Sequence, residues 1–239
     1  MTYKVNAITL HTVDYKDSDK IITFFTLEKG KISAAARGVR KANAKLKGIT
    51  EPFCFAELVL AERSGRNTVT EADVYDSFYP IRTDIVKYYV GMTALEFSYV
   101  LMQEELEAPS YYAMLLEFLQ KLAYSAINPV NLLVKFMSDA LGDVGYGLNL
   151  SRCGRCGEEI VGRVFLSVSD GVSVCEHCKA AGDKEYSFKT WEYLKGIYEG
   201  DLESGDNETR SNALKFFQYY LSVSAGVSLK CLATLGSMI

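Results

Sequence analysis

Four cysteines in two Cys-x-x-Cys pairs are the residues of this chain best suited to chemistry. Cys153 and Cys156 form the first pair, Cys175 and Cys178 form the second, and eighteen residues separate the pairs. Each pair can direct two thiolates at one ion, and this spacing is typical of tetrahedral zinc sites with four sulfur ligands. Four thiolates leave no coordination position for water, so the pattern favours one structural zinc ion per chain over a catalytic one. Redox pairs and unmetallated thiols are the alternatives.

Catalytic groups are otherwise scarce. The only histidines are His11, on an expected strand, and His177, which we expect at the surface between Cys175 and Cys178, with replacement of one thiolate as a metal ligand as the alternative. The chain has no Gly-x-Ser-x-Gly, no phosphate-binding P-loop and no dinucleotide fingerprint. It also lacks the His-x-Glu element of zinc deaminases. We therefore expect a protein that is not an enzyme.

A basic run is the second group of candidates. Residues 29–47 hold seven lysines and arginines and no acidic residue, although the net charge of the 239-residue chain is −4. Such a run can neutralise phosphates without reading a base sequence. Phe24, Phe25, Phe53 and Phe55 could offer stacking surfaces to unpaired bases, but for each of them singly a place in the hydrophobic core is favoured over stacking. A nucleic acid is the partner that this composition favours, and a merely solvated loop is the alternative.

The secondary structure that must position these residues is predicted to change from strands to helices along the chain. Residues 4–13, 20–27, 31–39, 53–63 and 67–75 alternate apolar and polar side chains between turn signals and read as strands. Five short strands before residue 80 predict an OB-like barrel. From Ile85 to Leu106 apolar residues recur every three or four positions, which predicts one long helix. A second helix around residues 114–122 and a third that begins at Asn128-Pro129 follow.

The cysteine pairs flank a predicted hairpin that turns at Asp170-Gly171. Helical spacing resumes at Phe188, so the metal module is inserted within a helical domain. The expected fold is therefore α+β, with an OB-like nucleic-acid-binding domain at 1–80 and a mainly α-helical domain at 81–239 that carries a zinc-ribbon-like module at about 151–182. The start of the chain lacks signal-peptide features and no apolar stretch could cross a bilayer, so we expect a cytoplasmic protein without a membrane partner.

Several landmarks, in this order, resemble the bacterial RecO family of recombination mediators. They are Asp14-Tyr15-Lys16-Asp17-Ser18-Asp19-Lys20-Ile21, Phe25-Thr26-x3-Gly30, Ala36-Arg37-Gly38-Val39-Arg40-Lys41, Glu51-Pro52-Phe53 and the four-cysteine module. Two positions depart conservatively from the family pattern, at Asp17 and at Asp170-Gly171. Some family members lack the cysteines, which suggests that the zinc supports the fold.

The resemblance implies recombinational DNA repair, with binding of single- and double-stranded DNA and annealing of complementary strands. It also implies association with RecR and with the C-terminal tail of single-stranded DNA-binding protein, indirect action on RecA, and a location at the nucleoid. The residues that we expect to contact phosphates are Arg37, Arg40, Lys41, Lys45 and Lys47, with Lys16, Lys20, Lys29 and Lys31 as second choices. A tail pocket should be apolar with a basic rim, to which Arg210, Lys215 and Lys230 could belong. A zinc-ribbon RNA-binding or transcription-associated factor, a thiol-redox or deaminase enzyme, and a protein-binding scaffold are the competing functions.

Overall fold

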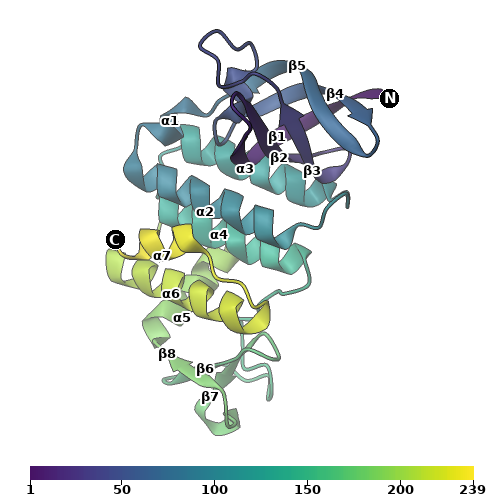
Figure 1. Cartoon of the computed structure of the whole chain (residues 1–239). Helices are drawn as coiled ribbons and strands as arrows, with labels where there is room; N and C mark the ends of the chain where they lie inside the picture. The colour runs from purple at the N-terminus through teal and green to yellow at the C-terminus, as the bar shows by residue number, and fades with distance from the viewer. The chain divides into compact units, whose positions relative to one another are not determined.

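The computed structural model describes residues 1–239, which form two compact units, Met1–Ser125 and Ala126–Ile239 (Figure 1). The expected boundary at residue 80 follows the change from strand to helix and stays a prediction. The compact units divide later, because the first three helices belong to the same unit as the barrel. None of the helices is both long and apolar enough to span a membrane.

The first unit is built on a closed five-stranded barrel, as the strand pattern predicts. Its strands are β1 (Thr2–Tyr15), β2 (Asp19–Thr26), β3 (Gly30–Ala36), β4 (Phe55–Arg63) and β5 (Arg66–Asp76). The hydrogen-bonded order is β1-β2-β3-β5-β4, and β4 returns to β1. The barrel closes through only two parallel pairs, Ala34 with Asn67 and Ala35 with Thr68. This closure is therefore the least continuous seam of the sheet.

The alternation of side chains along β2 fills two different spaces. Phe24 belongs to the barrel core together with Ile22 and Leu58. Phe25 points to the opposite face of the strand, where its ring lies 5.6 Å from that of Tyr111 in α3 (Pro109–Tyr124). Successive side chains of a strand point to opposite faces, so a strand covered by a helix on the outside buries both residues. Both phenylalanines are at most 1 % exposed.

Helices α1 (Tyr79–Arg82) and α2 (Ile85–Leu101) follow the barrel. The Asp84 side chain caps α2 by accepting hydrogen bonds from the Val86 and Lys87 amides. The expected helix through Leu106 was wrong in its last turn, because α2 ends at Leu101 and Glu104 then forms a bridge with Lys31 of β3. The Glu105 amide donates to the Lys31 carbonyl over 2.9 Å.

The Glu51-Pro52-Phe53 landmark has a structural role in this unit. Phe53 has a φ of 69° and is fully buried. The Arg82 guanidinium donates to the Pro52 carbonyl over 3.0 Å and pairs with Glu51 at 3.7 Å. A Cβ added to Gly91 of α2 would lie 2.7 Å from the Phe53 ring, so α2 approaches this turn as closely as a glycine allows.

The second unit combines four helices with a small three-stranded sheet. The helices are α4 (Pro129–Asp143), α5 (Phe188–Glu199), α6 (Asn207–Ser224) and α7 (Lys230–Gly236). The sheet has the order β7-β6-β8, formed by Val172–Cys175, Val164–Ser167 and Lys184–Tyr186. The Asn128 cap of α4 and the hairpin between β6 and β7 are confirmed. Strand β8 was not expected from the sequence.

Candidate nucleic-acid interface and metal centre

A groove of about 680 Å³ lies across the β3–β5 seam of the barrel. We call it the barrel groove. The β1–β2 turn borders it with Tyr15 and Lys16, the end of β3 with Arg37, and the β4–β5 hairpin with Gly65 and Arg66. These are the two loops and the strand face with which OB-folds bind oligonucleotides. The groove is therefore the candidate nucleic-acid interface.

Arg66 is a groove residue that the sequence reasoning missed. Ser64 and Gly65 both have positive φ and form a two-residue hairpin loop, which places Arg63 opposite Arg66 in register. Like charges directly opposite each other destabilise a strand pair. Both arginines are exposed and neither makes an ion pair. The turn signal Ser64-Gly65 marks these positions in the sequence, but only barrel closure brings Arg66 into the same groove as Lys16.

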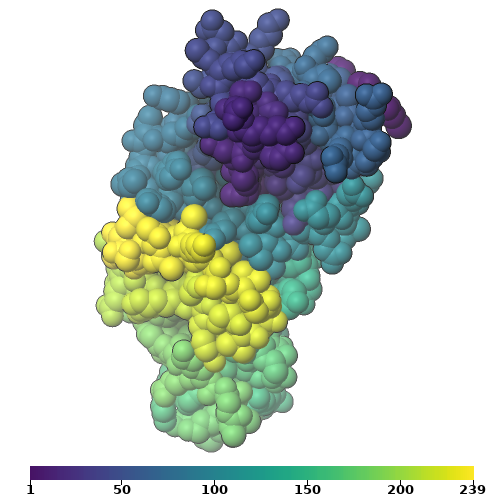
Figure 2. Space-filling model, viewed as in Figure 1, coloured from purple at the N-terminus to yellow at the C-terminus, as the bar shows by residue number.

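The basic loop, residues 37–47, begins at the rim of this groove. In Figure 2 its dark blue atoms protrude at the top of the view. Four of its cations are exposed and make no ion pair, namely Arg37, Lys41, Lys45 and Lys47. Arg40 lies 3.4 Å from Asp14 and donates to the Lys16 carbonyl, so it is held beside the β1–β2 turn. The structure thus brings Lys16, Arg37 and Arg40 to one end of the barrel.

Three of the second-choice lysines are placed differently. Lys31 is 8 % exposed, donates to the Tyr99 carbonyl over 2.8 Å and lies 3.5 Å from Glu104. Its ammonium is therefore engaged by partners within the protein, the Tyr99 carbonyl and Glu104. Lys29 lines a separate, acidic hollow, with its Nζ 4.8 Å from the Tyr3 ring. Lys20 lies 3.6 Å from Asp14.

Most of the aromatic side chains considered for base stacking are in the core. Phe24, Phe25 and Phe53 are buried, so the core position that was favoured for each is confirmed, and these three rings are not exposed for stacking. Phe55 is half-buried and contacts Tyr75. The aromatic ring at the groove is Tyr15, which is 45 % exposed. It ends β1, where alternation no longer requires burial.

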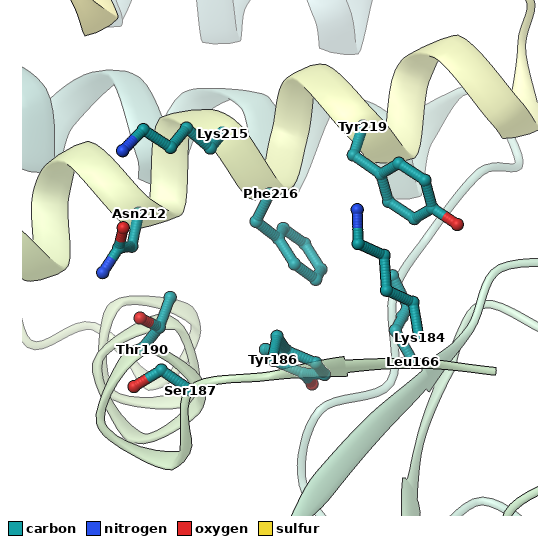
Figure 3. Close-up of a pocket in the computed structure, with 9 residues that line it drawn as sticks. All are labelled: Leu166, Lys184, Tyr186, Ser187, Thr190, Asn212, Lys215, Phe216 and Tyr219. Atoms are coloured by element: carbon teal, nitrogen blue, oxygen red, sulfur yellow. The ribbon is translucent and has the colours of Figure 1, made fainter.

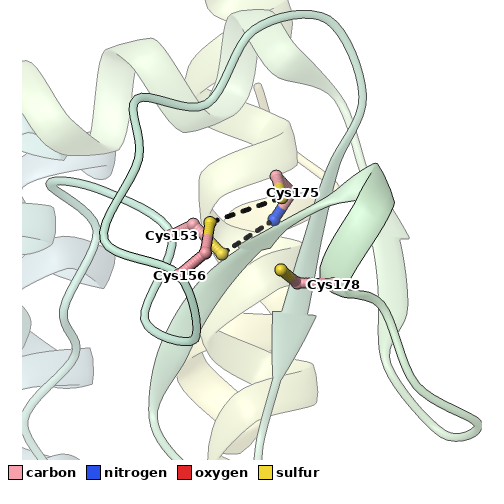
Figure 4. Close-up of side chains that lie close together, drawn as sticks. All are labelled: Cys153, Cys156, Cys175 and Cys178. Carbon is pink, nitrogen blue, oxygen red and sulfur yellow. Dashed lines mark hydrogen bonds between the residues drawn. The ribbon is translucent and has the colours of Figure 1, made fainter.

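The four cysteines converge on one point of the second unit, as Figure 4 shows. Their sulfur atoms all lie within 4.8 Å of one another, and Cys156 Sγ lies 4.0 Å from Cys175 Sγ. Tetrahedral zinc with bonds of about 2.3 Å requires sulfurs about 3.8 Å apart. The cluster therefore fits a metal ion with four thiolate ligands. His177 lies on the short 3-10 turn between Cys175 and Cys178 but does not belong to the cluster.

Backbone contacts prepare the cluster for a cation. Burial raises the pKa of Cys153, but hydrogen bonds from the amides of Cys175, Cys156 and Arg155 outweigh it and lower that pKa to about 6. Neighbouring sulfurs raise the pKa of Cys178 to about 12. Four thiolates in contact repel one another, so a bound cation is what allows all four to ionise.

Two arginines of the module have their charges compensated by ion pairs. Arg155, inside the first cysteine pair, donates to the Cys178 carbonyl and to the carboxylate of Asp183, whose side chain is 5 % exposed. Arg163 joins Glu176, inside the second pair, to Glu185 of β8, with contacts of 2.7 Å and 2.5 Å. Each cysteine pair is thereby tied to the segment that contains β8.

A second pocket, of about 260 Å³, lies between β8, β6 and helix α6. We call it the α6 pocket. Leu166, Tyr186 and Phe216 form an apolar floor, and Lys184 and Lys215 are exposed at its edge. Figure 3 shows Phe216 pointing from α6 toward Tyr186. No carboxylate lines the pocket, so it presents apolar surface together with positive charge.

Of the rim residues expected from the sequence, the structure places Lys215 at this pocket. The Arg210 guanidinium instead donates to the Asn131 side chain over 2.9 Å, and Lys230 begins α7. Lys184, which β8 supplies, was missed because β8 itself was not expected.

Comparison with known proteins gives matches over both units. The family described as Recombination protein O N terminal matches residues 1–78, and Recombination protein O C terminal matches residues 82–233. The DNA repair protein RecO of Clostridium novyi is 27 % identical over 227 residues, which cover 93 % of this chain and 89 % of the relative. The RecO protein of Syntrophomonas wolfei is 30 % identical over 224 residues, with coverages of 92 % and 89 %. That of Frankia casuarinae is 31 % identical over 203 residues, with coverages of 84 % and 83 %.

Proposed function

Because the chain belongs to the recombination protein O family, whose relatives are named as DNA repair proteins, we propose that it is a recombinational repair mediator that binds DNA through its barrel. In this proposal it binds single- and double-stranded DNA, anneals complementary strands, and helps RecR to load RecA onto DNA coated by single-stranded DNA-binding protein. The observation that carries the DNA-binding part is the set of unpaired cations around the barrel groove.

The contacts follow from the positions of these cations. Lys16, Arg37 and Arg66 border the groove, and the loop cations Lys41, Lys45 and Lys47 extend the positive surface beyond it. Cations without a protein partner are available to replace the counterions of a phosphate backbone. The exposed Tyr15 ring offers a stacking surface for an unpaired base.

Annealing requires no nucleophile or general base. It requires two strands held close together, with their phosphate charge neutralised and their bases free to pair. A basic surface that binds phosphates lowers the repulsion that opposes the encounter of the strands. The barrel face supplies that surface, which is why we propose a mediator and not an enzyme.

The metal in this proposal is one structural Zn²⁺ held by Cys153, Cys156, Cys175 and Cys178. Sulfur-only tetrahedral sites are typical of zinc and of iron–sulfur clusters. Four thiolates around one ion cross-link the hairpin and leave no coordination position for a reactive water. The cysteine pairs, with their arginine partners, orient the sheet of the second unit.

We place the acidic tail of single-stranded DNA-binding protein at the α6 pocket. Its apolar floor fits an apolar side chain, and Lys184 and Lys215 fit carboxylates. Pockets of this kind give affinity through the buried side chain and orientation through a few charged groups.

The test is a salt titration of binding to single-stranded DNA by the double variant Arg37→Glu, Lys41→Glu, which reverses two exposed loop cations that make no ion pair. Loss of two phosphate contacts should weaken binding and reduce the log–log salt slope by about 1.4, since each contact contributes about 0.7. The control reverses two exposed helix lysines, Lys121→Glu and Lys189→Glu, and should keep the slope of the unchanged protein. An unaltered slope in the loop variant would remove the barrel from the proposal.

Two further assays separate the competing functions. Matched DNA and RNA oligonucleotides in competition distinguish a repair mediator from an RNA-binding factor, because phosphate contacts alone do not discriminate between them. Annealing of complementary labelled strands, with and without single-stranded DNA-binding protein, tests the mediator activity itself. Failure to accelerate annealing at protein concentrations that saturate the DNA would contradict it.

A further inference from the structure

The α6 pocket has one wall of helix and one wall of metal module. Asn212, Lys215 and Phe216 come from α6, whereas Leu166 comes from β6, and Lys184 and Tyr186 come from β8. Strands β6 and β8 belong to the sheet that also carries Cys175 at the end of β7. The pocket therefore keeps its shape only while this sheet stays against the helices.

The central strand joins the metal ligands to the pocket wall residue by residue. Val164 of β6 pairs with Cys175 on one side and with Tyr186 on the other. Leu166 pairs with Ser173 and with Lys184. The Tyr186 hydroxyl also hydrogen-bonds the Ser173 hydroxyl over 2.7 Å, across the strand between them. A displacement of β7 would therefore move the pocket residues of β8.

The arginine ion pairs form a second connection between the same two places. Arg163 spans from Glu176, between the last two cysteines, to Glu185, which lies between the pocket residues Lys184 and Tyr186. Arg155 spans from the Cys178 carbonyl to Asp183, the residue before Lys184. Both cysteine pairs are thus attached to β8 by side chains as well as through β6.

We propose that the metal centre and the α6 pocket are coupled sites: the bound metal holds the β8 wall in place, so the pocket binds an acidic peptide with an apolar end tightly only when the metal is present. This inference rests on the proposed function for the identity of the metal and of the pocket ligand. What it adds is a role for the module, in which Arg155 and Arg163 are positioning residues that transmit metal binding to the pocket.

Coupling of two binding sites is reciprocal. If metal strengthens peptide binding by a given factor, the peptide must strengthen metal binding by the same factor. Factors of about 5 to 150 are typical of coupled sites. We expect about tenfold here.

The experiment uses the full chain loaded with zinc and a fluorescein-labelled hexapeptide of aspartates and apolar residues that ends in phenylalanine. Fluorescence anisotropy gives the peptide affinity before and after zinc removal with a chelator, and should show a loss of about tenfold. The zinc affinity, measured by competition with a colorimetric chelator, should rise about tenfold in the presence of peptide. The same peptide with alanine at its end controls for direct zinc binding by aspartates.

Variants keep the test decisive if metal removal unfolds the module. Arg163→Ala retains all four cysteines, and under saturating zinc it should lower the peptide affinity by about tenfold. Arg152→Ala removes an exposed arginine next to Cys153 that makes no ion pair, and should have no effect. Lys215→Glu should abolish peptide binding while the zinc affinity stays unchanged.

The outcomes distinguish failure of the coupling from failure of the pocket assignment. Equal peptide affinity in Arg163→Ala and the unchanged protein, together with equal zinc affinity with and without peptide, would overturn the coupling. Absence of peptide binding to the zinc-loaded protein would overturn the assignment of the pocket. Neither result affects DNA binding by the barrel groove, which the salt titration tests independently.

Discussion

The barrel and the metal module both contain arginines and lysines, but they use them in opposite ways. Around the barrel groove, Arg37 and Arg66 are exposed and have no carboxylate partner. In the metal module, Arg155 and Arg163 each contact two acidic side chains. The first pair of arginines remains available to a ligand, whereas the second is committed to the fold.

A basic residue therefore predicts a nucleic-acid contact only when its charge is left unpaired. Residues 29–47 contain no acidic residue, yet Lys31 lies 3.5 Å from Glu104 in the folded chain. Arg40 similarly pairs with Asp14, at 3.4 Å. Partners distant in sequence decide which cations of a basic run can bind phosphate.

The largest expected effect comes from removing one cysteine of the candidate metal centre. Cys153→Ser removes one ligand and should weaken zinc binding by more than about 100-fold, the upper range for loss of a residue that only supports a ligand. Since structural zinc contributes about 10–16 kcal/mol of binding free energy in small zinc domains, we expect the second unit to unfold at lower temperature.

Trp191 measures this change selectively. It is the only tryptophan of the chain, and its indole donates to the carbonyl of Leu150, just before the first cysteine pair, over 2.9 Å. Its fluorescence should report early unfolding of the second unit while binding of DNA by the barrel persists. A Cys153→Ser protein with full zinc content and unchanged Trp191 unfolding would contradict the metal assignment.

The next effect tests the unpaired cations of the barrel. Replacing both Arg37 and Arg66 by alanine should lower the affinity for single-stranded DNA and reduce the salt slope by about 1.4. Arg163→Ala is the matched control, because it removes an arginine whose charge is already compensated. If Arg163→Ala lowered the slope as much as the groove variant, pairing would not distinguish the two classes of arginine.

A smaller effect separates a buried lysine from the exposed ones. Lys31→Met removes the donor to the Tyr99 carbonyl and the partner of Glu104. Loss of such a buried hydrogen bond should lower the unfolding free energy by about 1–3 kcal/mol. The salt slope of DNA binding should not change, and chemical denaturation alongside the salt titration would measure both quantities. A reduced slope at unchanged stability would assign Lys31 to the DNA interface instead.

The smallest effect concerns the acid stability of the ion-paired arginines. The Arg155 guanidinium lowers the pKa of Asp183, so the carboxylate is more acidic in the folded than in the unfolded chain. A depressed pKa stabilises the fold above the unfolded value of about 3.9, and this stabilisation is lost as the pH falls through the folded pKa. The unfolding temperature followed by Trp191 should therefore fall below about pH 4, and less steeply in Asp183→Asn. Parallel curves for the two proteins would exclude this ion pair as a cause.

Local patterns predicted much of the fold. Alternation located all five barrel strands, and the Asn128-Pro129 pair located the start of α4. The pattern failed at Leu106, since the apolar spacing continues past the helix end while the backbone pairs with β3. It also missed β8, because three residues are too few for a period and the strand forms only against β6.

The candidate sites were predictable to different degrees. The candidate metal centre was predictable because each of its two short motifs brings its own pair of sulfurs together. The barrel groove is not, because Lys16, Arg37 and Arg66 meet only when the parallel β3–β5 seam closes. Phe24 and Phe25 could not be assigned to core or surface by alternation alone, because α3 covers the outer face of β2.

By itself the sequence determined the barrel strands, the four cysteines of the candidate metal centre, the order of the landmarks that resemble the family, and the position of the basic run. These features depend on residue type and on short spacings, which do not change when the chain folds. The tertiary structure alone decided which cations are paired, which aromatic rings are buried, and that the α6 pocket shares a wall with the metal module. Those properties depend on side chains that are far apart in sequence, and burial and charge compensation are set only when the chain brings such side chains into contact.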